Sequence, residues 1–322
     1  MEKIFITGGA GFIGSHVVRR LLNQGHEVVV YDSFMQYVYP LNVIQQYNAT
    51  ERFKSIEDRI QIIRGNTQNL DFLIRVFKET RPTRIIHLAA MPLVKLAKDQ
   101  PEEAATAILQ GTINLLQAAR HIETIKRIVY ISSSMVYGDF QDSQANEEHP
   151  TNPKNIYGGL KLSGEILTSV YARRFGIDFA IVRPSAVYGP TDNNERVLSI
   201  FLHSALAGKP IKVFGKGVAL DFTYVTDTAD GIILVALKHE ASMKTFNITR
   251  GKSRTILEAA NIIAGMIPGT QIRIMDKEEN LPVRGTLDIS HAKNLLGYNP
   301  GIDLEQGLSM YLDFIIKKKV LN

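Results

Sequence analysis

The sequence has 322 residues and lacks cysteine altogether. A chain without cysteine has no disulfide framework, no thiol nucleophile and no thiolate metal site. It also lacks an apolar run of the roughly 18 residues that a membrane-spanning helix requires, and a predicted strand begins by residue 3. We therefore expect a soluble, cytoplasmic protein without a membrane segment.

A strong excess of one charge sign is absent as well. The 37 lysines and arginines outnumber the 32 acidic residues only slightly, for a formal net charge of +5, and they are scattered along the chain instead of gathered in a stripe. We expect no nucleic-acid partner. The 8 histidines have no companions at metal-ligand spacing, so we also expect no metal site.

What the sequence does contain is a glycine-rich N-terminus. An apolar strand at 4–6 runs into glycines 8, 9, 11 and 14, and an amphipathic helix is predicted from Phe12 to Leu22. Glycines between a strand and a helix let the backbone turn sharply and approach a pyrophosphate, which the N-terminus of the helix attracts. Ordinary turns and close helix packing also use such glycines, so this pattern alone leaves both interpretations open.

A carboxylate follows the second predicted strand. This strand, at 27–31, ends in Asp32, at the place where a carboxylate accepts the ribose hydroxyls of an adenosine and repels a 2′-phosphate. No arginine follows at 33–35 to receive such a phosphate. The sequence therefore favours NAD over NADP.

The order of the predicted elements indicates the fold. Strands at 60–64, 84–88, 127–132 and 179–183 alternate with helices at 69–80, 102–121 and 155–175. This alternation predicts an α/β fold, a Rossmann-type doubly wound parallel sheet whose ligands lie at the carboxyl ends of the strands. Beyond Arg183 the elements become shorter. We predict an NAD-binding domain at 1–183, with parts of 222–250 packing back onto it, and a smaller C-terminal α/β substrate-binding lobe at 184–322.

Two side chains one helical turn apart are candidates for proton transfer. Tyr157 and Lys161 lie four residues apart at the start of a long predicted helix. A nearby ammonium favours the phenolate and lowers the tyrosine pKa, as a general base at a sugar hydroxyl requires. The same pair also fits the surface of an amphipathic helix. Serines at 132–134, at the carboxyl end of a strand, could hydrogen-bond the same substrate oxygen and favour the catalytic interpretation, although serines there often only form turns.

Taken together, these motifs identify a family. They comprise Gly8 to Gly14, Asp32, His87 to Ala90, Ser133 before Val136–Gly138, Tyr157 with Lys161, Arg183–Pro184 before Val187–Pro190, Asp221 to Val225, and Asp288 to Ser290. In this order, over nearly the whole chain, they resemble the extended short-chain dehydrogenase/reductases, and more narrowly the NAD-dependent sugar epimerase/dehydratase family.

The resemblance implies a site and an assembly. Its catalytic set would be Ser133, Tyr157 and Lys161, acting with a tightly held NAD on a nucleotide-linked hexose, usually at C4. Its cofactor-binding residues would be Gly8, Gly11, Phe12, Ile13, Gly14, Asp32, Asn66, Thr67, Leu88, Ala89, Ala90, Tyr157 and Lys161. The helices at 102–121 and 155–175 resemble those through which family members form homodimers.

Departures from the family pattern narrow the chemistry. The family's dehydratases carry Asp-Glu directly after the catalytic hydroxyl residue, and its decarboxylases also use the Glu, whereas this chain has Ser134 and Met135. The missing carboxylate favours a nucleotide-sugar epimerase that acts through a transient 4-keto sugar. The resemblance implies that the epimerised carbon is C4 and that the enzyme has a role in cell-surface polysaccharide biosynthesis. The alternatives are a dehydratase, decarboxylase or keto-sugar reductase of the same family, or a non-catalytic dinucleotide-sensing or scaffold protein.

Further departures affect the substrate site. Ala186 replaces a common Asn, Leu220 an Arg that often grips the diphosphate, Ile108 a common Asn, and Asn66 the usual Asp. Losing a charge-assisted phosphate contact costs roughly 1.5 to 3 kcal/mol, so another cation should take its place. Arg284 is the first candidate, followed by Arg254 and Arg196. The expected substrate contacts are Ser134, Met135, Ala186 and Arg284.

Overall fold

A computed structural model gives the fold of the protein. It describes residues 1–35, 37, 51–194, 196–277 and 282–319. Within that part of the chain, no helix is both long and apolar enough to cross a membrane.

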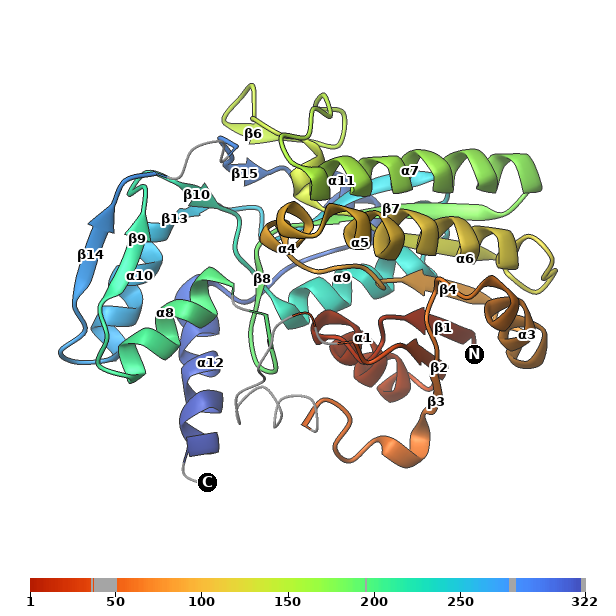
Figure 1. The fold of residues 1–322 in the computed structure, drawn as a ribbon, viewed down its shortest axis with the longest axis horizontal. Helices are drawn as coiled ribbons and strands as arrows, with labels where there is room; N and C mark the ends of the chain where they lie inside the picture. Colours follow the sequence, from red (N-terminus) through yellow and green to blue (C-terminus); the bar gives the residue numbers. More distant parts are fainter. Residues whose placement is uncertain (36, 38–50, 195, 278–281, 320–322) are drawn as a thin grey trace.

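A seven-stranded parallel sheet forms the centre of the molecule (Figure 1). Its strands are β1 (Lys3–Thr7), β2 (Glu27–Asp32), β3 (Gln61–Arg64), β4 (Arg84–His87), β5 (Arg127–Ile131), β7 (Asp178–Pro184) and β12 (Lys244–Ile248). They lie in the order β12-β7-β5-β4-β1-β2-β3, and every neighbouring pair is parallel. The chain reverses its direction of travel across the sheet between β1 and β4, and such a switch point is where doubly wound sheets bind ligands. The predicted fold class is confirmed.

Helices cover both faces of the sheet. They are α1 (Phe12–Asn23), α3 (Leu70–Thr80), α4 (Val94–Asp99), α5 (Pro101–Ala105), α6 (Gly111–Ala119), α7 (Ile156–Phe175), α9 (Val225–Leu237) and α11 (Ser290–Leu296). Alternate residues of β1 point to opposite faces, as a strand requires. Ile4 and Ile6 join one core with residues of α1, α9 and α11, while Phe5 joins another with residues of α3 and α6.

The helix predicted at 102–121 is interrupted. A π-helical turn, η2 (Thr106–Gln110), separates α5 from α6. Directly after it, Gly111 packs so closely on Thr67 that an added Cβ would lie 2.5 Å from the threonine hydroxyl. A π turn is a common device where a helix passes a functional site, and Ala107 within it lines the pocket described below.

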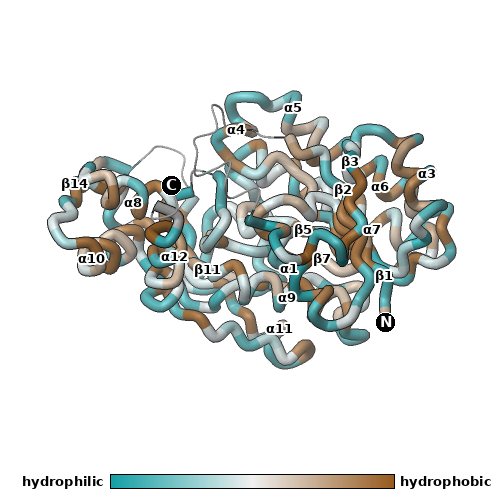
Figure 2. Tube along the Cα trace, turned by 90° about the horizontal axis from the view of Figure 1, so that it is seen from below, coloured by the Kyte–Doolittle hydropathy of each residue, from teal (hydrophilic) through white to brown (hydrophobic). Residues whose placement is uncertain are grey.

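A second core lies beyond the sheet, on the left of Figure 1. It is formed by α8 (Val197–Leu206), α10 (Ile256–Met266), α12 (Leu304–Lys319), and the parallel pair β9 (Ile211–Phe214) and β14 (Ile272–Met275). Figure 2 shows brown, apolar segments both in the sheet and along α10 and α12. We call the part built on this second core the small lobe.

Several short elements complete the described part of the fold. They are β6 (Gln144–Ala145) paired with β15 (Thr286–Leu287), β8 (Val187–Tyr188) with β11 (Thr223–Tyr224), β10 (Ala219–Leu220) with β13 (Arg254–Thr255), and the 3-10 turns η1 (Glu57–Arg59), η3 (Ser134–Val136) and η4 (His239–Ala241). Although α11 follows β14 and β15 in the chain, its Ala292 and Leu296 pack in the core of the large sheet. The domain boundary at residue 183 stays a prediction.

Candidate active site

The glycines after β1 bring three backbone segments together. Gly8 has φ +70, and a Cβ on it would lie 2.7 Å from the backbone nitrogen of Ala89 at the end of β4. A Cβ on Gly14, in the first turn of α1, would overlap the carbonyl oxygen of Gly8. These positions therefore require glycine so that α1 starts directly against the loop.

The N-terminus of α1 is suited to an anion. Its N-cap residue, Gly11, offers no side-chain hydrogen bond, and no acidic residue occupies the first turn. The first N–H groups of a helix have no partner within the helix, and the helix dipole adds positive potential there. A pyrophosphate group fits this position without a competing side chain.

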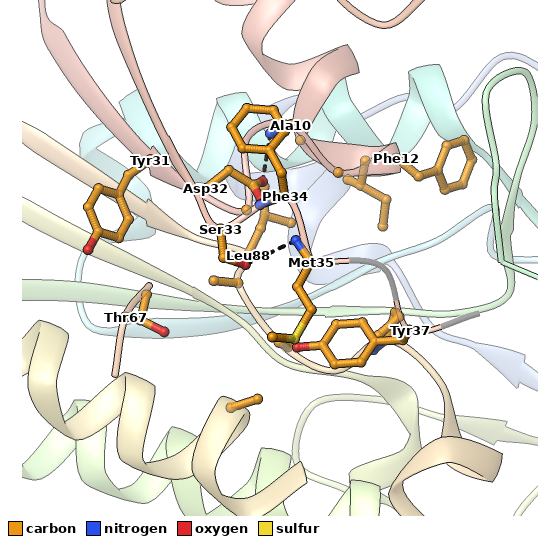
Figure 3. Close-up of a pocket in the computed structure, with 18 of the residues that line it drawn as sticks. Ala10, Phe12, Tyr31, Asp32, Ser33, Phe34, Met35, Tyr37, Thr67 and Leu88 are labelled. Carbon is orange, nitrogen blue, oxygen red and sulfur yellow. Dashed lines mark hydrogen bonds between the residues drawn. The ribbon is translucent and has the colours of Figure 1, made fainter. Parts of the chain in front are cut away.

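Asp32 lies at the end of β2 beside this loop (Figure 3). One carboxylate oxygen accepts the N–H of Ala10 at 2.9 Å, and the other accepts the N–H of Phe34 at 2.8 Å. Burial raises the pKa of Asp32, whereas these two hydrogen bonds and the nearby Arg52 lower it. The carboxylate is thus held rigidly at the place where the ribose of a dinucleotide would bind.

One pocket collects eleven of the thirteen predicted cofactor residues, and the other two, Tyr157 and Lys161, do not line it. Its lining includes Gly8, Gly11, Phe12, Ile13, Gly14, Asp32, Asn66, Thr67, Leu88, Ala89 and Ala90. Figure 3 shows several of these side chains around one cavity at the carboxyl ends of the strands. The pocket therefore has the glycine cradle, the uncapped helix and the carboxylate that NAD requires, and its residues fit that cofactor.

The pocket also contains residues that the sequence did not indicate. They include Tyr37, Arg52, Phe53, Asn193 and Asn194, which come from irregular segments, and they lie beside Arg196, one of the three candidate cations. The guanidinium of Arg52 donates to the carbonyl oxygens of Ala10 and Thr191, both at 2.9 Å, and so links the glycine loop to the segment before the small lobe. No arginine is present at 33–35, but Arg52 reaches the vicinity of Asp32 from farther along the chain.

Ser133 follows β5 at the carboxyl edge of the sheet. Its hydroxyl accepts the N–H of Met135 at 3.2 Å and caps η3. It also interacts with the phenol of Tyr157 and lowers the pKa of that group. Helix α7 can approach this turn because Gly158 has no side chain: a Cβ there would lie 2.6 Å from the carbonyl oxygen of Met135. The predicted serine and tyrosine are thus adjacent.

The pKa of Tyr157 differs from the prediction. Burial raises it, and the groups that oppose burial are Arg196 and Ser133. The ammonium of Lys161 lies 5.9 Å from the centroid of the Tyr157 ring and donates to the carbonyl oxygen of Ile131 at 2.8 Å. The expectation that Lys161 gives Tyr157 a lowered pKa is therefore wrong here, because desolvation of the phenolate outweighs the cations around it.

The predicted substrate residues lie in different parts of the structure. Ser134 and Met135 are buried in η3, and Ala186 is half-buried at φ +38 beside the second core. Leu220, where the family resemblance implied a phosphate-binding arginine, packs inside that core. None of these four residues lines the dinucleotide pocket. Their contacts with a substrate stay predictions.

The three arginines that are candidates for a substrate phosphate differ in their ion pairs. Arg254 is paired with Glu258 at 3.1 Å and with Glu305 at 2.8 Å. Arg196 pairs with Asp192 at 2.6 Å, lies 5.4 Å from the ring centroid of Phe12 at the start of α1, and lines the pocket. For half-buried Arg284, burial lowers the pKa to about 10, and no acidic side chain in the described part of the chain pairs with it.

Comparison with known proteins places these features in context. A model of the NAD dependent epimerase/dehydratase family matches residues 4–249. The chain is 30% identical to the UDP-glucose 4-epimerase of Mycolicibacterium smegmatis, over 98% of this chain and 99% of that protein. It is 29% identical to UDP-glucuronic acid decarboxylase 1 of Xenopus tropicalis, over 98% of this chain and 73% of that protein. It also matches the crystal structure of UDP-glucuronic acid 4-epimerase from Bacillus cereus with UDP-glucuronic acid and NAD, with a TM-score of 0.88, 31% identity, and coverage of 98% of this chain and 99% of that one.

Proposed function

The chain belongs to the NAD-dependent epimerase/dehydratase family, and on that premise we propose that it is a nucleotide-sugar epimerase acting at C4 of a nucleoside-diphosphate hexose. One observation carries this proposal. Ser133, Tyr157 and Lys161 converge at the carboxyl end of β5, beside a pocket that fits NAD, and no carboxylate accompanies them at position 135.

Each of the three side chains has a role at the C4 hydroxyl. Tyr157 takes the hydroxyl proton, and Ser133 holds the same oxygen through its hydroxyl. Arg196 supplies positive charge that favours the phenolate against the cost of burial. The ammonium of Lys161, 5.9 Å from the centroid of the Tyr157 ring, is the second cation beside this group. When bound, NAD supplies the oxidation of the sugar at C4 and its reduction on the opposite face. Tyr157 then returns the proton to the new hydroxyl.

The residue at position 135 distinguishes the proposed epimerisation from the other reactions of the family. Dehydration and decarboxylation rely on a carboxylate at this position, whereas the Met135 side chain is a buried thioether that cannot accept a proton. A 4-keto sugar formed here therefore meets no base at C5 from this position. The keto sugar instead rotates within the site, and C4 is reduced on its other face.

The small lobe supplies a surface for the nucleotide. A groove on it is lined by Val197, Ile200 and Phe214, with Lys212 and Arg273 among its cations. Val197, which lines this groove, directly follows Arg196, which lines the dinucleotide pocket. We assign the substrate's base to this groove and its diphosphate to Arg196 and Arg284 in place of the missing arginine at Leu220.

The long helices support a homodimer. On α7, the apolar side chains of Ile156, Ile166 and Val170 are exposed, the last two by 55% each. Their spacing places them along one side of the helix, where burial against a second copy would remove apolar surface from water. We assign the dimer contact to this helix and to the segment at 102–121.

The test is turnover of a panel of UDP-, GDP-, CDP- and dTDP-sugars, without added cofactor, followed by NMR. We expect interconversion of C4 epimers without net formation of NADH. Loss of water or carbon dioxide from any sugar would contradict the proposal. Tyr157→Phe should retain bound NAD, measured by absorbance after denaturation, and should lose turnover by about 10²- to 10⁴-fold.

A further inference from the structure

A buried ion pair lies directly behind the candidate catalytic lysine. Glu165, on α7, and Arg183, on β7, are both buried, and two hydrogen bonds join them. Arg183 Nε donates to one carboxylate oxygen at 3.0 Å, and Nη2 donates to the other at 2.6 Å. Such a bidentate pair fixes the orientation of the carboxylate as well as its position.

Glu165 is one helical turn beyond Lys161, on the same face of α7. Its carboxylate also accepts the hydroxyl of Ser132, the residue after Ile131, whose carbonyl oxygen accepts the Lys161 ammonium at 2.8 Å. Both oxygens of Glu165 are thus occupied by Arg183 and Ser132. No hydrogen bond joins Glu165 to Lys161 among the described residues, although the two charges attract each other.

The other groups around Lys161 do not stabilise its charge in this way. The aromatic rings of Tyr130 and Tyr157 lie 5.3 and 5.9 Å from the ammonium. His87, on β4, is neutral, because burial lowers its pKa to about 3, and Arg183 is itself a cation. Burial lowers the pKa of Lys161 to about 8, and Glu165 acts in the opposite direction.

We propose that Glu165 is a positioning residue that keeps Lys161 protonated, and that Arg183 restrains Glu165 from forming a direct ion pair with Lys161. The ammonium then remains free to act on Tyr157 and the cofactor. This inference rests on the proposed function, because it assigns Lys161 its role in catalysis. It goes beyond that function by giving a reaction-related task to two residues that contact neither substrate nor cofactor.

Two substitutions test the two halves of the proposal, and their effects have opposite signs. Glu165→Gln keeps the shape but removes the negative charge. The alkaline limb of the kcat profile should move to lower pH by about one unit, a tenfold change in the ionisation equilibrium of Lys161. Arg183→Gln frees the carboxylate to pair with Lys161 directly. The limb should then move to higher pH, while kcat on the plateau falls because the ammonium is withdrawn from Tyr157.

A second measurement does not depend on turnover. The pKa of Lys161 can be followed by NMR in protein with labelled lysine, with the signal assigned by its loss in Lys161→Met. It should fall in Glu165→Gln and rise in Arg183→Gln. If the wild-type protein converts no nucleotide sugar, the proposed function fails, but this titration still decides whether Glu165 controls the charge of Lys161.

A matched control separates these shifts from a general loss of stability. Arg127 and Asp178 form another ion pair between β5 and β7, at 2.6 Å, near the opposite ends of the strands. Asp178→Asn should reduce thermal stability without moving the pH limb or the Lys161 signal. If Glu165→Gln does not fold, Glu165→Asp replaces it, and its retained charge should keep the limb near the wild-type pH. An unmoved limb and signal in Glu165→Gln would overturn the first half of the proposal, and a downward shift in Arg183→Gln would overturn the second.

Discussion

The contact between α7 and the turn after β5 gives a sharp prediction. In Gly158→Ala, the new Cβ would lie 2.6 Å from the carbonyl oxygen of Met135 and 3.0 Å from Cβ of Pro153. Cβ atoms in proteins do not approach a backbone oxygen so closely, so α7 must move away from η3 by several tenths of an ångström. Tyr157, the preceding residue, moves with it relative to Ser133.

The expected effects on stability and activity differ in size. Alanine gains about 1 kcal/mol over glycine in a helix, whereas overpacking costs about 1 to 3 kcal/mol. The free energy of unfolding should therefore fall by no more than about 2 kcal/mol, measured by urea denaturation. A displacement approaching 1 Å in an active site costs up to about 10²-fold in rate. We expect kcat/KM to fall by about 10- to 100-fold, with NAD still bound.

The matched control is Gly265→Ala in α10, where no atom lies within 4 Å of the new Cβ. It should raise the free energy of unfolding by up to about 1 kcal/mol and leave kcat/KM unchanged. Wild-type kcat/KM in Gly158→Ala would refute the inference that this glycine sets the distance between Ser133 and Tyr157.

Three further predictions concern the cofactor, pH and assembly. Asp32→Asn should weaken NAD binding by about tenfold, because a charged acceptor for the ribose is lost. It should also reduce the preference of the protein for NAD over NADP. Calorimetry with both cofactors measures the two affinities, and an unchanged ratio between them would contradict the prediction. Burial lowers the pKa of His16 to about 4 in the folded protein, against 6.5 in the unfolded chain. The stability that neutral His16 contributes is therefore fully present above pH 6.5 and is lost as the pH falls from 6.5 to about 4. Between pH 7 and 5 the wild type should lose about 2 kcal/mol more than His16→Asn in urea denaturation, and equal losses would exclude His16 as the cause. Ile166→Glu should convert the proposed dimer to a monomer in light scattering, whereas Ile274→Glu, at another exposed isoleucine on β14, should not. An unchanged mass for Ile166→Glu would contradict the assignment of the dimer contact to α7.

Local patterns in the sequence were sufficient to predict much of this structure. The strand-glycine-helix order at residues 3–23 and the alternation of strands with helices that follows it depend on neighbours in the chain. The fold class follows from them, as does the grouping of eleven of the thirteen predicted cofactor residues in one pocket. Such features are readable because periodicity and turn chemistry are encoded within a few residues.

Features that depend on distant neighbours could not be predicted. Arg52 reaches the pocket from an irregular segment with no motif, and its position is set by contacts with Ala10 and Thr191. The predicted direction of the Tyr157 pKa shift was wrong. Residue spacing in the sequence shows which charges are near a group, but it does not show how completely that group is desolvated. The close packing of Gly111, directly after the π turn, against Thr67 likewise joins residues that lie far apart in the sequence.

The most direct test of the central claim is turnover in D₂O. The account predicts that the C4 epimer forms with its original hydrogen at C4 and with no deuterium at C4 or C5, because the hydrogen removed from C4 returns to the same carbon without contact with solvent. NMR of the product after many turnovers measures both positions. Deuterium at C5, or at C4 of the epimerised sugar, would contradict the account.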